Sequence, residues 1–280
     1  MKSTPILPIC TALLTALLAP QLCPAQSSYQ VVPVQNGGTI KGTVKWQGAM
    51  PHLFVSEINK DLQICDPLSQ KHRDLERLVV SPDGGVANTV VYLKNVAAGK
   101  ALDLPATRRF LNQKTCRYEP HILLVPAEGT LTVKSSDPIL HTVHMSGSAD
   151  YNLPFVTAGQ EISRPMTREG VVDLRCNAGH VWMNAEMIVA SNPYYAVTDA
   201  EGNFELTDVP PGQYDIVAWH EGWRMVGESP LYDVMTQVRV KRPIFSAPVT
   251  WSKTVTVPAQ QTVEVHFTLG EKTPQLAQGH

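Results

Sequence analysis

Short β-branched segments separated by turn residues restrict this chain to an all-β fold. Segments such as 37–46, 88–93 and 130–134 alternate around Val, Ile and Thr, the pattern of half-buried strands. Gly, Pro, Asn or Asp bounds each of them, and the chain contains 22 prolines, which disfavour long helices. No helix longer than two turns is predicted. We therefore expect an all-β protein built from two to three small β-sandwich units.

The strand signals fall into three groups along the chain. The first group spans 38–112 and includes a Pro-Asp-Gly-Gly turn, the second spans 117–191, and the third spans 194–270. Each group is predicted to form its own sandwich. The stretch 222–248 is less regular and is expected to be an excursion from the third unit.

The amino terminus has the pattern of a secretory signal peptide. Lys2 precedes an apolar stretch over 5–18, and small residues ending at Ala25 precede a polar segment, so residues 1–25 are predicted to be removed. No other apolar stretch approaches the roughly 20 residues of a membrane helix. We expect a periplasmic or secreted protein without a membrane span. With a formal net charge of −2, the chain carries no nucleic-acid-binding footprint.

Three candidate metal ligands lie close together near the end of the second unit. Cys176, His180 and Met183 fall within one eight-residue stretch, and His141 lies upstream. A thiolate, two imidazoles and a weak axial thioether are the ligands of blue-copper sites. The predicted centre is one copper ion held by His141, Cys176, His180 and Met183. His144 and His121 remain alternative upstream ligands.

The cysteine count supports this assignment. Cys10 and Cys23 leave with the signal peptide, so Cys65, Cys116 and Cys176 remain. In an oxidising compartment two of three cysteines are expected to pair, and Cys176 has the metal-ligand neighbours. A Cys65–Cys116 disulfide is therefore predicted, the alternative being three unpaired buried thiols.

The second unit resembles the cupredoxins. The resemblance rests on Tyr118 followed by a Pro two residues later, the turn at Gly129 and the segment 136–143. Segments 197–204 and 209–221 of the third unit resemble a carboxypeptidase-regulatory-like β-sandwich. As a whole, the chain is similar to bacterial periplasmic proteins that join a cupredoxin-like unit to such a sandwich. The resemblance implies a cupredoxin-like Greek-key sandwich.

The ligand loop departs from the plastocyanin type. Three residues separate Cys176 from His180 and two separate His180 from Met183, where plastocyanin-type loops usually have two and four. This spacing resembles half of the binuclear copper loop of cytochrome oxidase subunit II, but that site needs a second cysteine where this chain has Val172. A mononuclear centre is therefore predicted. Thr142 stands where cupredoxins usually have Asn, which weakens the bonding between ligand loops.

The leading functional hypothesis is an electron carrier rather than an enzyme, with an unidentified redox partner protein. A copper chaperone or storage protein would use the same ligands. A thiol enzyme would use Cys176 as nucleophile with His180 as its base. A metal-free cupredoxin-like binding module would leave Cys176 and Met183 as core residues.

Overall fold

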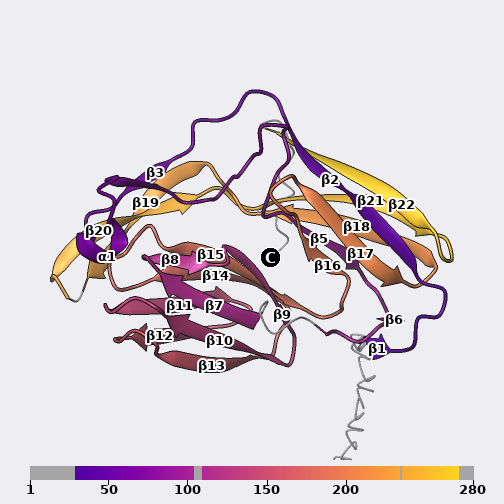
Figure 1. The fold of residues 1–280 in the computed structure, drawn as a ribbon, viewed down its shortest axis with the longest axis horizontal. Coiled ribbons are helices and arrows are strands. Elements are labelled where there is room, and N and C mark those ends of the chain that lie inside the picture. The colour runs from indigo at the N-terminus through magenta and orange to yellow at the C-terminus, as the bar shows by residue number, and fades with distance from the viewer. Residues whose placement is uncertain (1–28, 104–108, 234, 271–280) are drawn as a thin grey trace, which may run out of the picture.

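The computed structural model describes residues 29–103, 109–233 and 235–270. Nearly all the regular structure in these ranges is β-strand (Figure 1), and the helix α1 (Leu62–Cys65) is a single turn. The predicted all-β class is confirmed. The predicted signal peptide lies outside the described residues. Among the described residues, no helix combines the length and apolar character needed to cross a membrane.

Residues 110–190 form one complete sandwich, which we call the inserted sandwich. Its larger sheet has the order β12-β11-β14-β15-β9, with strands β9 (Ile122–Pro126), β11 (His141–Gly147), β12 (Tyr151–Phe155), β14 (Gly170–Cys176) and β15 (Asn184–Ala190). Its smaller sheet has the order β13-β10-β7-β8, with strands β7 (Phe110–Lys114), β8 (Arg117–Glu119), β10 (Gly129–Ser135) and β13 (Glu161–Met166). The chain changes sheet five times, after β8, β9, β10, β12 and β13. This is the Greek-key sandwich of cupredoxin type that the sequence predicts.

Side-chain alternation sets which residues of β11 and β14 face the core. His141, Val143 and Met145 are buried, whereas Thr142 and His144 are partly exposed, because successive side chains of a strand point to opposite faces. β11 and β14 are antiparallel, with Val143 opposite Cys176. The start of β11 and the end of β14 therefore meet at one end of the core.

The remaining large sheets form a second sandwich, which we call the enclosing sandwich. One sheet has the order β16-β5-β18-β21 and the other β17-β2-β22. The strands are β2 (Gly38–Gln47), β5 (Val90–Lys94), β16 (Tyr195–Val197), β17 (Asn203–Val209), β18 (Gly212–His220), β21 (Val249–Val257) and β22 (Thr262–Gly270). They come from both sides of the inserted sandwich in sequence.

The prediction of a separate sandwich over 38–112 is therefore wrong. β2 lies between β17 and β22, and β5 lies between β16 and β18. β7, which the prediction placed in this first unit, belongs to the inserted sandwich, so that sandwich begins before 117. Local alternation identifies strands but does not name their partners, and these partners lie more than a hundred residues away.

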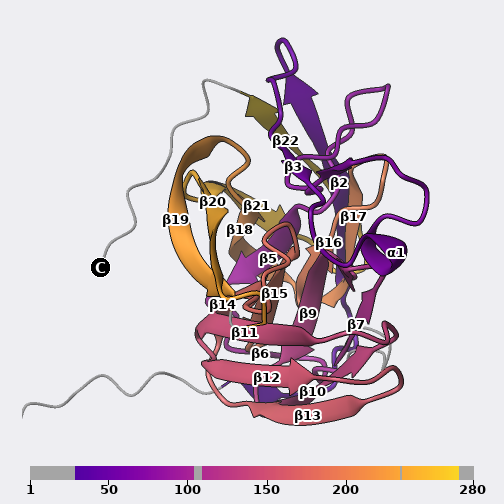
Figure 2. The same cartoon turned by 90° about the vertical axis from the view of Figure 1, so that its left-hand side faces the viewer.

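Two excursions from the enclosing sandwich reach across to the inserted one. The N-terminal excursion, residues 48–89, contains α1 and the paired strands β3 (Val55–Glu57) and β4 (His72–Asp74). The second is a hairpin of β19 (Met225–Asp233) and β20 (Val238–Phe245), where the sequence predicted an irregular excursion. Figure 1 shows both excursions lying over the same end of the inserted sandwich, and Figure 2 shows the hairpin extending toward β14. A short pair of β1 (Gln30–Val31) and β6 (Ala98–Gly99) completes the strands.

The two sandwiches pack through a shared apolar layer. Strands β9 and β15 are buried along their whole length, because their outer face meets β5 and β18. The buried residues of this layer are Val90, Ile122, Leu124, Ile188 and Trp219.

A buried arginine adds charge pairing to this interface. Arg77 of the N-terminal excursion forms an ion pair with Glu221 at 2.8 Å and lies 3.7 Å from Glu186 of β15. Burial and the nearby carboxylates of Asp173 and Glu221 raise the pKa of Glu186 well above its usual value. Burial would also raise the pKa of Glu221, but His121 and Arg77 lower it. Glu221 therefore carries the charge that Arg77 balances.

Candidate metal centre

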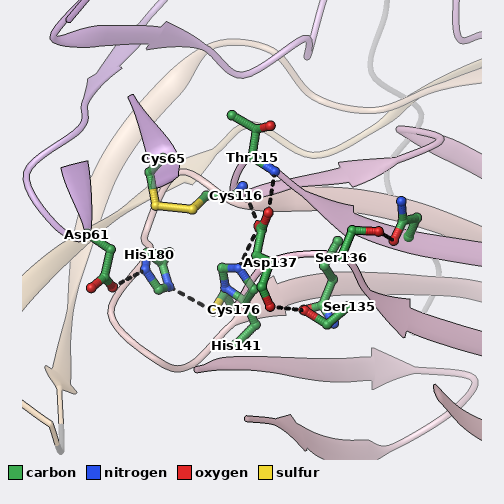
Figure 3. A network of polar contacts seen from close by, with 12 residues as sticks. Asp61, Cys65, Thr115, Cys116, Ser135, Ser136, Asp137, His141, Cys176 and His180 are labelled. Atoms are coloured by element: carbon green, nitrogen blue, oxygen red, sulfur yellow. Dashed lines mark hydrogen bonds and ion pairs between the residues drawn. A yellow bond between two sulfur atoms is a disulfide. The ribbon is translucent and has the colours of Figure 1, made fainter. Parts of the chain in front are cut away.

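The structure brings three of the four predicted ligands together at one end of the inserted sandwich. His141 begins β11, Cys176 ends β14, and His180 lies in the loop between β14 and β15. One ligand atom from each lies within 4.8 Å of the others, and all three side chains are fully buried. Figure 3 shows the two imidazoles on either side of the Cys176 sulfur.

The loop that carries His180 is held in a tight inward turn. The backbone N–H of Asn177 donates to Thr142 O at 3.1 Å, and that of Met183 donates to His180 O at 3.0 Å. Gly179 has φ 89°, and a Cβ there would lie 2.4 Å from Oδ2 of Asp233. Only glycine fits this conformation against the β19–β20 hairpin.

Both imidazoles are oriented by carboxylates. His141 donates from Nε2 to Oδ2 of Asp137 at 2.9 Å, and His180 donates from Nε2 to Oδ2 of Asp61 at 2.8 Å (Figure 3). The other nitrogen of His180, Nδ1, lies 3.7 Å from Cys176 Sγ. Nδ1 of His141 is buried and has no hydrogen-bond partner within the described part of the chain. A carboxylate on Nε2 fixes the tautomer that leaves a lone pair on Nδ1, as in metal-binding histidines.

The electrostatics of this cluster favour the ligand form of the cysteine. Burial alone would raise the pKa of the Cys176 thiol, but the neighbouring imidazoles of His141 and His180 lower it to about 5. Burial would lower the pKa of His141, but the hydrogen bond to Asp137 and the nearby Cys176 sulfur raise it to about 9. At neutral pH the metal-free chain therefore holds a thiolate beside an imidazolium, and the thiolate is the form that binds metals.

The donor set also fits a metal ion in its dimensions. Zinc bonds are about 2.3 Å long to sulfur and about 2.1 Å long to nitrogen. If two such bonds are set roughly 120° apart, the sulfur and the nitrogen lie about 3.8 Å from each other. The separation between Cys176 Sγ and His180 Nδ1 is 3.7 Å. One thiolate and two imidazoles in this arrangement suit copper.

The other predicted ligands are placed differently. Met183 is buried in the same apolar cluster as Cys176, and its axial role stays a prediction. His144 lies on the opposite face of β11, and His121 pairs with Glu221 at the sandwich interface. Of the three upstream histidines, His141 is therefore the one that lies beside Cys176.

The cysteine pairing agrees with the prediction. Cys65 and Cys116 form a disulfide, and Cys176 is free. The disulfide ties α1 to the turn between β7 and β8. It thereby holds Asp61, the residue before α1, close to His180.

Sequence reasoning missed the two carboxylates. Asp137 lies four residues before His141, a spacing that could have suggested a partner. Asp61 lies 119 residues from His180, so no local pattern connects them.

Comparisons with known proteins find partial similarity. The sequence pattern of the family described as BOS complex subunit NOMO1-like, second beta sandwich domain, matches residues 190–243, which lie mostly in the enclosing sandwich. No curated protein matches the chain.

Several solved structures of copper proteins match parts of the chain. An oxidised mutant of amicyanin is 25% identical over 29% of this chain and 80% of its own, with a TM-score of 0.27. A novel purple cupredoxin from Nitrosopumilus maritimus is 19% identical over 29% of this chain and 98% of its own, with a TM-score of 0.26. The copper-containing nitrite reductase of Thermus scotoductus SA-01 is 19% identical over 32% of this chain and 24% of its own, with a TM-score of 0.28.

Proposed function

We propose that this protein binds one copper ion per chain through Cys176, His141 and His180, with Met183 as a weak axial ligand, and that it carries electrons. One observation carries the proposal. Two buried imidazoles have their Nε2 atoms bonded to carboxylates, which leaves their Nδ1 atoms beside a cysteine held as thiolate. Copper bound there supplies a one-electron couple between Cu(II) and Cu(I).

The rigidity of the ligands supports electron transfer. Asp137 and Asp61 hold both rings, and backbone hydrogen bonds hold the loop between Cys176 and Met183. A site that moves little between oxidation states exchanges electrons with little reorganisation. The fixed tautomers also prevent the rings from turning away as the charge changes.

Burial supports a resident ion over one that is passed between proteins. Cys176, His141 and His180 have no exposed surface, so another protein's ligands cannot reach the site without displacing a covering segment. Asp61 is 34% exposed and accepts a hydrogen bond from His180. We assign this pair as a route for electrons to an unidentified redox partner protein. A periplasmic or secreted location is proposed from the signal-peptide pattern.

The axial ligand separates an electron carrier from a copper chaperone. In a carrier the thioether tunes the potential more than the affinity, so Met183→Leu should keep copper and colour and raise the reduction potential. Met187→Leu is the matched control, because Met187 is a buried thioether of β15 within the same core. It should leave the potential unchanged. Potentials are measured by spectroelectrochemistry and affinities by competition titration.

A chaperone would give a different result. There Met183 is a main soft ligand for Cu(I), so Met183→Leu would lose most Cu(I) binding. If Cu(I) binding is lost and the protein never forms a coloured Cu(II) state, the electron-carrier assignment is wrong and the protein is a copper chaperone or storage protein.

A further inference from the structure

The Cys65–Cys116 disulfide lies against the candidate copper site. One ligand atom of His180 and the two sulfur atoms all lie within 4.8 Å of one another, and all three residues are buried. Cys116 also lies in a group of the same size with Asp137 and His141. Figure 3 shows the disulfide above the His180 ring, whereas Asp61 lies on the side of the ring away from Ser135 and Ser136.

The backbones around both cysteines are fixed by contacts that do not involve the sulfur bond. The Arg73 guanidinium donates to Cys65 O at 2.5 Å, to Cys116 O at 2.9 Å and to Thr115 O at 2.7 Å. Asp137 accepts hydrogen bonds from the backbone N–H groups of Thr115 and Cys116 at 2.7 and 2.8 Å. These charge-assisted bonds keep the two cysteines adjacent if the disulfide opens.

The cover over Cys65 is thin. Leu62, in the same single helical turn, is 53% exposed, and Gln63 is also exposed. Opening this one turn, which carries Cys65 itself, would bring Cys65 toward a small dithiol in solution.

We propose that reduction of this disulfide creates a second metal site, formed by Cys65, Cys116 and His180, that binds Cu(I). A dithiol reductant supplies two electrons and two protons. The Cys65–Cys116 bond breaks to give two thiols, and the dithiol closes to its own disulfide. Each thiol releases its proton to solvent when it binds the ion. The inference goes beyond the proposed function and is linked to it through His180, which belongs to both ligand groups, so the two sites bind an ion as alternatives.

The ligand chemistry selects a soft ion of low charge. Two thiolates and one imidazole are soft donors that suit Cu(I), whereas the sulfurs of an intact disulfide are not thiolates and bind metals poorly. The redox state of the disulfide would then set how strongly the chain retains Cu(I).

The test uses the Cys176→Ser full-length protein, so that the first site's thiolate cannot contribute. The disulfide is reduced with dithiothreitol, the reagent is removed without air, and Cu(I) is titrated against a chromophoric chelator. Residues that only hydrogen-bond to a metal ligand contribute about 10–100-fold to metal affinity. Two thiolates that bind the ion directly should contribute more, so reduction should raise the Cu(I) affinity at least about a hundredfold. X-ray absorption should find two sulfur ligands.

The matched control adds Cys65→Ser and Cys116→Ser to the same protein. Its Cu(I) affinity should not respond to dithiothreitol. An equal rise in this control, or no rise in the Cys176→Ser protein, would overturn the proposal. So would loss of the β-sheet circular dichroism on reduction, because the site requires the Arg73 and Asp137 contacts to persist. The first copper site is tested separately with the disulfide intact, so the two proposals can fail independently.

Discussion

The two sandwiches differ in how the chain builds them and in what each gives to the site. The inserted sandwich is continuous over 110–190 and supplies every predicted copper ligand. The enclosing sandwich combines strands from before and after it and supplies none of them. Its two excursions instead cover and orient those ligands. The contrast indicates that the ligands are local in sequence, whereas the surroundings that tune them are assembled from distant segments.

The contacts of the excursions illustrate this division. Lys60 donates to Ala178 O at 2.6 Å and pairs with Asp233 of β19 at 2.5 Å. Arg242 of β20 donates to Cys176 O at 2.6 Å and to Asn177 Oδ1 at 2.9 Å. Both excursions therefore contact the backbone of the ligand loop.

The largest expected effect comes from removing the buried arginine at the interface of the two sandwiches. Arg77→Ala leaves Glu221 as a buried carboxylate without its arginine, and removing one partner of a buried pair costs about 3–5 kcal/mol. We expect this loss in the free energy of unfolding from urea titrations.

Lys41→Ala is the control for this substitution. Lys41 pairs with Glu264 within the enclosing sandwich, and both side chains are more than half exposed. Its loss should cost less than about 1 kcal/mol. Equal costs for the two variants would mean that the buried Arg77–Glu221 pair stabilises the fold no more than an exposed pair does.

The second prediction compares the two carboxylates that orient the imidazoles. Asp61→Asn changes a residue of the N-terminal excursion, and Asp137→Asn changes a residue of the inserted sandwich. Loss of a carboxylate that orients a metal-binding imidazole lowers metal affinity by about 10–100-fold. Both variants should weaken Cu(II) binding within this range, measured by competition titration. Asp215→Asn, an exposed carboxylate on β18 that accepts a hydrogen bond from Thr254, is the control. If only Asp137→Asn weakens binding, the enclosing sandwich does not tune the site.

A third, smaller effect is the pH dependence of copper binding. Below the His141 pKa of about 9 the metal-free ring carries a proton on each nitrogen, and binding at Nδ1 must release one. The Cys176 thiol, with its pKa of about 5, is already ionised above that value. From these two groups, Cu(II) affinity should rise about tenfold per pH unit between about pH 5 and about pH 9 and then level off.

Asp137→Asn sharpens this prediction. Asp137 is one of the two partners, with Cys176, that raise the pKa of His141, so the affinity of the variant should level off at lower pH. Wild-type affinity that is constant between pH 6 and pH 8 would contradict the thiolate–imidazolium pair.

Sequence alone predicted the elements whose determinants are local. Cys176 and His180 lie in one loop, and His141 starts a strand whose alternation points it inward, so short-range patterns sufficed. The odd number of cysteines predicted the disulfide. The partners of β2 and β5 and the carboxylate of Asp61 could not be predicted, because those contacts join segments about a hundred or more residues apart. The hairpin of β19 and β20 was also missed, since half of its residues are exposed and its pattern is weak.

The visible absorption of the disulfide-intact protein loaded with Cu(II) tests the central claim most directly. We expect one Cu(II) per chain and a strong thiolate-to-copper charge-transfer band, which Cys176→Ser abolishes. Circular dichroism should show that the variant keeps its fold, because serine is close in size to the buried cysteine. A wild-type protein that takes up substoichiometric copper, or a Cys176→Ser protein with the same colour, would contradict the assignment.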